Sequence, residues 1–442
     1  MLLLIFRAFS TLSIITGNSS IIFSLLILSK VIYLNRVVFL KFLTTNKFNL
    51  SMKVLIYTHE FPPFLGGLAT TSFKLGKGIS EAGLEVTVLA PQYSSQDMDL
   101  DKYFNFRVVR MGKLTRNHGI PSPIKEAAGF LSLIRALSDI NPDVVIFITR
   151  EAHFAGGLLS KLPYKVIVRV AGYEAFKYLL GKRVTKRAFG LPMKRLYMRA
   201  YKIISPSMST KELLERAGIP GDKIDVIYNG VNNYMLSQVP NPRILEGLRS
   251  KFNIKSGEKV VLTVSRLVPG KGQDAVIRAM PKVLRERNGF KYLIVGEGRY
   301  ERRLKELCEK EGVSSKVIFA GPVPHSEVIN FYDLCDVFVM PNRPIKNAEN
   351  IEGLPNVVLE AASRGKPVIA GIPGGSKEVI EHGESGYVVN GENIDEIAKC
   401  ILDLLNDETK AHNFGARGRQ RIEKIFTEEK MIDSYLEVIK AC

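Results

Sequence analysis

Tryptophan is absent from this chain of 442 residues, and cysteine (four residues) and histidine (six residues) are scarce. The cysteines are Cys308, Cys335, Cys400 and Cys442. No pair of them has the short spacing of a zinc or redox motif, which excludes a disulfide scaffold and favours a reducing compartment. Glycine and proline are near average usage, and 46% of the residues are hydrophobic. A collagen-like or mainly disordered chain is therefore excluded, and the length predicts two large domains or three smaller ones.

Acidic residues are missing from residues 1–51, where five basic residues give a net charge of +5. Residues 52–235 hold 26 basic and 15 acidic residues, a net charge of +11. Residues 236–442 hold 31 basic and 29 acidic residues, a net charge of only +2. The basic excess thus belongs to the first half. A basic half indicates a polyanionic partner, either a membrane surface or a nucleic acid.

The densest basic cluster lies within residues 178–199, where no acidic residue occurs. Its basic residues are Lys182, Arg183, Lys186, Arg187, Lys194, Arg195 and Arg199. Apolar side chains are interleaved with them, including Tyr178 and Leu191. Two interpretations stay open: an amphipathic segment that lies on anionic lipid, or a solvated helix face beside a core face.

Residues 8–29 carry no charge and are long enough to span a bilayer, but 10 of these 22 residues are Ser, Thr, Asn or Gly. No small-residue cleavage site precedes the folded part, so a removable secretory signal is not expected. Residues 1–51 are then either a membrane anchor, whose basic residues keep the rest of the chain in the cytoplasm, or a prefix ahead of a true start at Met52.

After Met52, short apolar runs alternate with amphipathic stretches of helical length. The predicted strands are 54–57, 85–90, 106–110, 144–148, 166–170, 202–205, 260–264, 291–295, 317–320, 337–340, 367–370 and 386–388. The predicted helices include 70–82, 124–139, 273–287, 299–311, 356–364 and 394–406. This alternation predicts an α/β fold of parallel sheets covered by helices on both faces.

The segment at residues 238–242, Gln-Val-Pro-Asn-Pro, reads as a linker. We therefore expect two doubly wound, Rossmann-like domains, one at residues 52–237 and one at residues 246–427. Such domains place a ligand cleft between the carboxyl ends of their strands.

A phosphate-binding pattern occurs at residues 265–272, Ser-Arg-Leu-Val-Pro-Gly-Lys-Gly, between a predicted strand and a predicted helix. Arg266 offers a planar fork of donors and Lys271 a point charge, and the two glycines let the backbone approach a ligand. The helix after this loop presents its N-terminus to an anion. The alternative is a structural turn with two surface bases.

Two carboxylates eight residues apart, Glu352 and Glu360, flank the start of another predicted helix. Pro355 suits the first turn of that helix. Carboxylates accept hydrogen bonds from hydroxyl groups, so one can bind a sugar and the other a ribose diol. Free backbone N–H groups at the helix start can hold a phosphate.

Three weaker glycine motifs come after strands: Gly66-Gly67, Gly296-Glu297-Gly298, and Gly374-Gly375 with Glu378 after it. Gly66 and Gly67 let backbone amides face a diphosphate across the cleft. Each motif taken alone is also consistent with an ordinary glycine-rich turn.

In this order along nearly all of residues 52–442, these motifs resemble the family-four retaining glycosyltransferases of the GT-B fold. The resemblance implies that Arg266 and Lys271 bind the donor diphosphate and that Glu352 contacts the transferred sugar. Glu360 would bind the donor ribose, with Glu297 and Val323 near the base. The other implied donor-binding residues are Gly66, Gly67, Gly353, Leu354, Pro355 and Asn356. The last helix, within residues 428–442, would cross back to the first domain.

The sequence departs from the family at Ala171, where a histidine is usual in a His-Gly-x-acid motif. His59 and His153 lie near other strand ends, where a lone histidine is more often a local hydrogen-bonding residue. In the front-face account of retention the leaving phosphate takes the acceptor proton, so the reaction does not need that histidine. We expect no catalytic metal, because Asp97, Asp99 and Asp101 fall in a first-half surface loop that is expected to be solvated.

The function expected from this resemblance is hexosyl transfer from a UDP- or GDP-linked sugar, with no further cofactor. The acceptor would be a lipid-linked or envelope glycan at the cytoplasmic face of the membrane, with Arg183, Arg187 and Arg195 on the acceptor and membrane side. Peripheral binding and anchoring by residues 1–51 both remain open. The alternatives are an inactive GT-B subunit that binds glycan or a partner, or a nucleotide-sugar epimerase. Nucleic-acid binding is not expected, because the basic cluster is too local.

Overall fold

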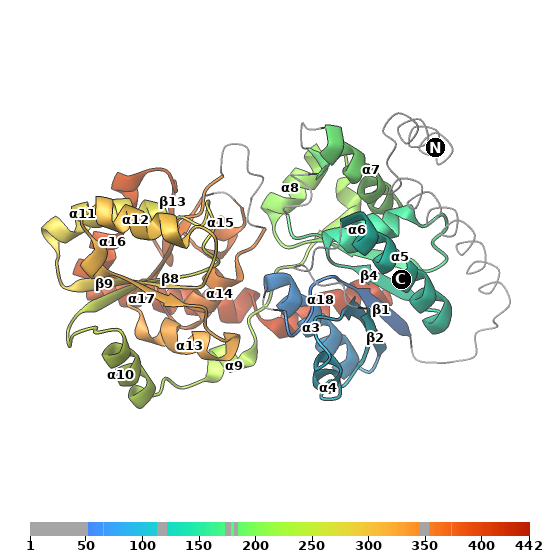
Figure 1. The fold of residues 1–442 in the computed structure, drawn as a ribbon, viewed down its shortest axis with the longest axis horizontal. Helices are drawn as coiled ribbons and strands as arrows, with labels where there is room; N and C mark the ends of the chain where they lie inside the picture. Colours follow the sequence, from blue (N-terminus) through green and yellow to red (C-terminus); the bar gives the residue numbers. More distant parts are fainter. Residues whose placement is uncertain are drawn as a thin grey trace.

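The computed structural model describes residues 52–64, 66–112, 122–172, 178–180, 184–344, 353–372 and 374–442, with the backbone alone for residues 122–127 and 184–188. These residues form two domains side by side, the first in blue and green and the second mainly in yellow and orange (Figure 1). None of the helices in these ranges is long and apolar enough to cross a membrane. Residues 1–51, expected to be either a membrane anchor or a prefix ahead of Met52, lie outside the described part of the chain.

The first domain is built on a parallel sheet of seven described strands in the order β3-β2-β1-β4-β5-β6-β7. Its strands are β1 (Lys53–Tyr57), β2 (Glu85–Pro91), β3 (Arg107–Met111), β4 (Val144–Phe147), β5 (Lys165–Arg169), β6 (Lys202–Ser205) and β7 (Ile224–Val226). Its helices are α3 (Gly67–Glu81), α4 (Asp97–Asp101), α5 (Ser122–Ile140), α6 (Arg150–Leu158), α7 (Val184–Arg199) and α8 (Met208–Arg216), with the short turn η2 (Gly221–Lys223).

The second domain is built on a parallel sheet of six described strands in the order β10-β9-β8-β11-β12-β13. Its strands are β8 (Lys259–Val264), β9 (Phe290–Val295), β10 (Val317–Gly321), β11 (Val337–Met340), β12 (Val368–Gly371) and β13 (Gly386–Val389). Its helices are α9 (Asn233–Ser237), α10 (Pro242–Lys251), α11 (Gln273–Glu286), α12 (Glu301–Lys310), α13 (His325–Leu334), α14 (Asn356–Ser363), α15 (Ser376–Val379), α16 (Ile394–Asn406) and α17 (Glu408–Ile425), with the turn η3 (Ser314–Lys316).

Both faces of each sheet are covered, as the apolar runs predict. In β1, Leu55 and Tyr57 enter the core formed with α5, α6 and α7, whereas Val54 and Ile56 enter the core on the opposite face. Successive side chains of a strand point to opposite faces, so a strand buried on both sides has to be apolar throughout. The predicted α/β class with two doubly wound domains is therefore confirmed, and most strand ends agree within one residue.

Strand β7 was not predicted, because its three residues, Ile224-Asp225-Val226, are too few and too polar to form an apolar run. Helix α9 already packs on the second domain, since Met235 lies in that domain's core. The predicted linker at residues 238–242 therefore runs over the surface of the second domain, between α9 and α10. Arg364 holds this segment, donating to the carbonyls of Met235 and Gln238.

The chain passes between the domains twice, and the two crossings touch. The Val231 amide donates to the Phe426 carbonyl at 2.8 Å, and the Glu428 amide donates to the Val231 carbonyl at 2.8 Å. After the second crossing, α18 (Glu428–Lys440) packs against α3 of the first domain (Figure 1). Five of its apolar side chains are buried there: Met431, Ile432, Tyr435, Leu436 and Ile439. The predicted return of the last helix to the first domain is confirmed.

Candidate active site

Each sheet has one point where the chain changes the direction in which it adds strands. These switch points lie between β1 and β4 in the first domain and between β8 and β11 in the second. Loops diverge at the carboxyl ends of such strand pairs and leave a crevice, which is where open α/β sheets bind ligands. Gly66 and Gly67 come after β1, and residues 265–272 come after β8, so both predicted phosphate motifs lie at switch points.

The loop at residues 265–272, here called the clamp loop, carries Arg266 exposed to solvent and Lys271 partly exposed. Its course is fixed by the loop after β9. The Leu267 amide donates to the Glu297 carbonyl at 2.8 Å, and the Tyr300 amide donates to the Leu267 carbonyl at 3.1 Å. A Cβ on Gly298 would lie 2.2 Å from the Leu267 carbonyl oxygen, so only glycine allows this approach. The weak Gly-Glu-Gly motif therefore supports the clamp loop.

The other side of the clamp loop is held by the segment after β11. The Arg343 amide donates to the Gly270 carbonyl at 2.9 Å, and the Arg343 side chain pairs with Asp274 at 2.6 Å. Arg278 pairs with the same carboxylate at 2.9 Å. Burial alone would raise the pKa of Asp274, but hydrogen bonds and charge from Arg343 and Arg278 lower it. No sequence pattern indicates Asp274 and Arg343, which meet only through the fold.

The turn before α14 lies directly against the first domain. A Cβ on Gly353 would lie 2.1 Å from the Ala171 carbonyl oxygen, and the ideal Cβ of Gly172 lies 3.1 Å from the Gly353 Cα. Residues 345–352, and with them Glu352, lie outside the described residues, as do Tyr173 and Glu174. The described part of the family motif around Ala171 is thus a backbone contact between domains, and it adjoins the predicted sugar-binding turn.

A chain of hydrogen bonds joins the buried core of the first domain to the start of α14. Arg169 donates to Asn229 Oδ1, and Asn229 Nδ2 donates to Asn356 Oδ1 at 2.7 Å. Asn356 is the first residue of α14, with Pro355 before it as N-cap. Gly67 lies beside it, since a Cβ there would be 3.4 Å from Asn356 Nδ2. The predicted donor residues Gly67, Gly353 and Asn356 therefore come together at the domain interface.

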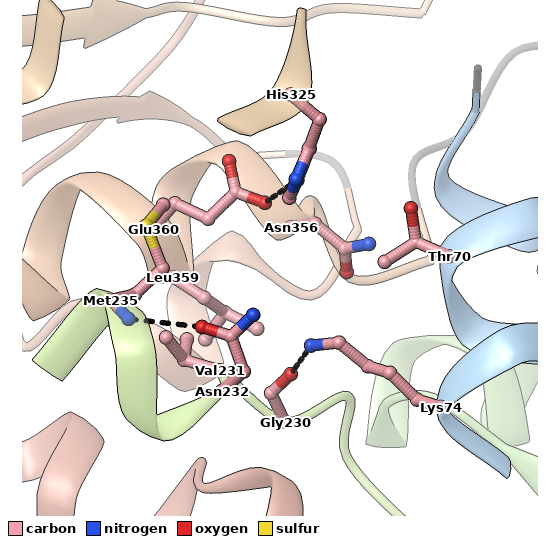
Figure 2. Close-up of a pocket in the computed structure, with 10 residues that line it drawn as sticks. All are labelled: Thr70, Lys74, Gly230, Val231, Asn232, Met235, His325, Asn356, Leu359 and Glu360. Carbon is pink, nitrogen blue, oxygen red and sulfur yellow. Dashed lines mark hydrogen bonds and ion pairs between the residues drawn. The ribbon is translucent and has the colours of Figure 1, made fainter. Parts of the chain in front are cut away.

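Glu360 lies one turn inside α14, in a pocket between the domains (Figure 2). Tyr332 donates to Glu360 Oε2 at 2.8 Å, and His325 Nε2 lies 3.4 Å from Oε1. Burial raises the pKa of Glu360, but hydrogen bonding and charge from His325 outweigh this and lower it. Glu360 is thus an oriented carboxylate at the edge of the pocket, which suits a hydroxyl-bearing ligand.

Lys74 closes the opposite side of this pocket. Its Nζ donates to the Gly230 carbonyl at 2.6 Å (Figure 2). The same Nζ pairs with Glu428 at 3.2 Å. Gly230 and Glu428 belong to the two crossings between the domains, so Lys74 of α3 binds both crossings to the first domain. Its position was not predicted, because no local pattern indicates it.

We expect the stability contributed by His325 to depend on pH. The hydrogen bond that His325 makes to Glu360 raises the pKa of His325 above 6.5, although burial and the nearby charge of Lys74 oppose the shift. A raised pKa stabilises the fold below the unfolded value, about 6.5, and this contribution is lost as the pH rises through the folded value. The free energy lost in His325→Ala should therefore be larger at pH 6 than at pH 8.5 in chemical denaturation. An equal loss at both pH values would contradict the ion pair.

His59 and His153 of the first domain both have structural contacts. His153 is fully buried, with its ring nitrogens 2.9 Å from the Tyr197 hydroxyl and 3.1 Å from the Arg169 carbonyl, and burial lowers its pKa to about 4. His59 Nε2 lies 2.8 Å from the Tyr57 hydroxyl. The interpretation of His153 as a local hydrogen-bonding residue is confirmed.

The expectation that Asp97, Asp99 and Asp101 are solvated is wrong for two of the three. Asp97 begins α4 with 1% of its surface exposed and accepts hydrogen bonds from the Tyr93 amide and the Ser94 hydroxyl. Asp101 pairs with Arg110 at 2.6 Å, and Asp99 alone lies in solvent. These carboxylates have buried partners that a charge pattern does not reveal.

The basic cluster falls partly outside the described residues, which exclude Arg183 and the side chain of Arg187. Arg195 is partly exposed on α7. Two other members bind backbone carbonyls, Lys194 that of Ala217 and Arg199 those of Leu159 and Ser160. Lys194 and Arg199 therefore hold neighbouring loops of the first domain through backbone hydrogen bonds.

Two doubly wound domains that face each other, with a final helix returning to the first, define the GT-B fold of nucleotide-sugar glycosyltransferases. A family model matches each of the two domains. The model "Glycosyltransferase Family 4" matches residues 65–233, and the model "Glycosyl transferases group 1" matches residues 246–421. A glycosyltransferase of Methanocaldococcus jannaschii is 30% identical over 364 residues, which cover 80% of this chain and 90% of that protein. The chain belongs to the group 1, family 4 glycosyltransferases.

One further relative and one solved structure are also similar to this chain. The GDP-mannose-dependent alpha-(1-6)-phosphatidylinositol monomannoside mannosyltransferase of Mycobacterium tuberculosis is 29% identical over 388 residues, covering 83% of this chain and 93% of that protein. The structure of Anabaena HepE with UDP and glucose superposes with a TM-score of 0.73 at 20% identity, covering 88% of this chain and all of that one. The structural likeness supports the fold.

Proposed function

We propose that this protein is a retaining hexosyltransferase that uses a UDP- or GDP-linked sugar and a lipid-linked or envelope glycan acceptor. The observation that carries the proposal is the clamp loop, whose Arg266 and Lys271 lie at the switch point of the second sheet. A guanidinium and an ammonium held there suit a donor diphosphate. The name of the mycobacterial relative favours GDP-mannose as donor and a phosphatidylinositol glycolipid as acceptor.

In the proposed reaction, the bond between the anomeric carbon and the diphosphate oxygen breaks as an acceptor hydroxyl forms a new bond on the same face. The hydroxyl proton passes to the leaving phosphate, so the first domain need not supply a base. Arg266 and Lys271 stabilise the negative charge that grows on the diphosphate, and Glu352 holds the transferred sugar. Glu360, which lines the pocket, binds the donor ribose.

Donor use is the direct test of this proposal. The protein is incubated with GDP-mannose, UDP-glucose, UDP-galactose and UDP-N-acetylglucosamine, and the release of GDP or UDP is measured with and without phosphatidylinositol-containing vesicles. We expect GDP release from GDP-mannose, stimulated by the vesicles, and a product whose anomeric configuration by NMR matches the donor. An inverted product would overturn the retaining assignment, and no release from any donor would favour the inactive subunit.

The proposed membrane side is the face of α7. Leu191 and Met198 are 62% and 43% exposed and lie seven residues apart, so they share one face of the helix with Arg195. An apolar and cationic face of this kind fits the cytoplasmic surface of an anionic membrane, whether the protein is peripheral or anchored.

We expect charge reversal of Arg183, Arg187 and Arg195 to Glu to weaken binding to vesicles that contain anionic lipid. Each basic residue near such a surface contributes about 1 kcal/mol, roughly fivefold in binding, and salt should weaken binding further. Sedimentation with vesicles measures the effect. Reversal of Arg302, Arg303 and Lys310, which are exposed on α12 of the second domain, is the matched control. If both triple variants bind like wild type, the cluster is only a solvated face.

A further inference from the structure

A carboxylate of the second domain caps a helix of the first. Glu378, in α15, accepts hydrogen bonds from the Met208 amide at 2.8 Å and from the Ser209 amide at 3.0 Å. These are the first two residues of α8, whose N–H groups have no partner within the helix. The Ser207 hydroxyl of the first domain satisfies only the next free amide, that of Thr210, at 3.1 Å. The N-terminus of α8 is therefore completed across the domain interface.

A second hydrogen bond joins the same two segments. The Ser209 hydroxyl donates to the Gly374 carbonyl at 3.1 Å, so Ser209 uses both its amide and its side chain to bind the second domain. Charge favours the arrangement, because a carboxylate at a helix N-terminus interacts well with the helix dipole and makes charge-assisted hydrogen bonds. Interfaces between domains of one chain are usually mobile, so such a bonded contact restrains their movement.

The restrained segment also holds the turn before α14. The Gly375 amide donates to the Gly353 carbonyl at 2.8 Å, and Gly375 approaches so closely that an added Cβ would lie 2.4 Å from that oxygen. Gly353 in turn rests on the Ala171 carbonyl of the first domain. Glu378 is thus connected to the turn by its own short loop and to the first domain by two hydrogen bonds.

We propose that Glu378 is a positioning residue for glycosyl transfer. It fixes the Gly353 turn relative to the first domain by capping α8. The inference rests on the proposed function, in which that turn holds the donor sugar. Neither Glu378 nor α8 needs to touch the substrate. Loss of the cap should leave each domain folded but let the two domains separate, and displacement of a reacting group by about 1 Å can lower turnover roughly 10²-fold.

The test compares Glu378→Ala, Glu378→Gln and Glu378→Asp with wild type. Glutamine keeps the size of the side chain but presents one NH2 group to a backbone N–H, so it cannot accept both hydrogen bonds. Aspartate keeps the charge and both oxygens. We expect a turnover loss of ten- to a hundredfold for Ala, a similar or smaller loss for Gln, and partial recovery for Asp, with changes in donor KM of less than threefold.

A second measurement does not depend on the reaction. Small-angle X-ray scattering of the full chain should show a larger radius of gyration in Glu378→Ala at an unchanged circular dichroism spectrum. The control is Glu384→Ala, which removes an exposed carboxylate that pairs with Arg417 inside the second domain. It should behave like wild type in both measurements.

The outcomes separate the two proposals. Wild-type protein that is inactive on every donor refutes the proposed function, while scattering still tests the cap. Active wild type with equally active and equally compact Glu378→Ala overturns the positioning role. If Glu378→Ala does not fold, Glu378→Gln, which keeps the size of the side chain but cannot accept both hydrogen bonds, is used instead. It should show a similar or smaller turnover loss, and full activity there would overturn the inference.

Discussion

Replacing Arg266 or Lys271 by alanine should lower turnover by roughly 10² to 10³-fold at saturating nucleotide sugar, while donor binding weakens less. The negative charge on the diphosphate grows as the sugar bond breaks, so a cation beside it interacts more strongly with the transition state than with the bound donor. Removing one such preorganised group costs about 3–4 kcal/mol in comparable sites. Single-turnover and steady-state assays on the best donor of the panel measure the effect.

The matched control is Arg302→Ala, which removes a side chain that is 92% exposed on α12 of the same domain. It should retain wild-type turnover and stability. Full turnover in both Arg266→Ala and Lys271→Ala, with the fold intact, would refute the clamp loop as the active centre and favour a non-catalytic subunit. Neither substitution removes a member of the network of Asp274, Arg278 and Arg343 that holds the loop.

The second large effect is expected from Gly353→Ala. The added methyl group would lie 2.1 Å from the Ala171 carbonyl oxygen and 2.9 Å from Pro206, both in the first domain. A contact under 3 Å with a backbone carbonyl cannot be relieved by rotating a side chain, so the two domains have to separate. We expect turnover to fall by roughly 10²-fold, because the donor turn then moves relative to the first domain. Each domain should keep its own stability.

Gly247→Ala is the control for this substitution. Gly247 lies in α10 of the second domain, and nothing lies within 4 Å of an added Cβ. Alanine is the better helix former, so stability should hold or rise by up to about 1 kcal/mol, with unchanged activity. If Gly353→Ala retains full turnover, the close approach of the domains does not matter for transfer.

The sequence predicted the fold well because most of the strands are apolar on both sides, which is typical of parallel sheets covered by helices. It also placed Arg266 and Lys271 correctly in a loop between a strand and a helix. In contrast, Asp274, Arg343 and Asn229 act through partners that are 60 or more residues away in the chain, such as Arg169 for Asn229. No local pattern reveals such partners.

The incorrect expectation about Asp97 has the same origin. Three aspartates at alternate positions indicate a solvated loop, but Arg110 on strand β3 pairs with Asp97 and Asp101. Glu378 was noted as the end of a glycine motif, but its partners are amides of the other domain. Backbone donors carry no sequence signature, so interdomain caps of this kind are found only from the structure.

The two contacting crossings have a consequence for how the protein is made. The five apolar side chains of α18 complete the core of the first domain, although the entire second domain precedes them in the chain. During synthesis, the β1–β7 sheet therefore emerges from the ribosome with that face covered by α3 but not by α18, and the core stays incomplete until α18 is made. The strands and helices described for the second domain lie in one continuous stretch of the chain. This domain can therefore fold before α18 is made and completes the core of the first domain. The domain that is translated first is thus the one that finishes folding last.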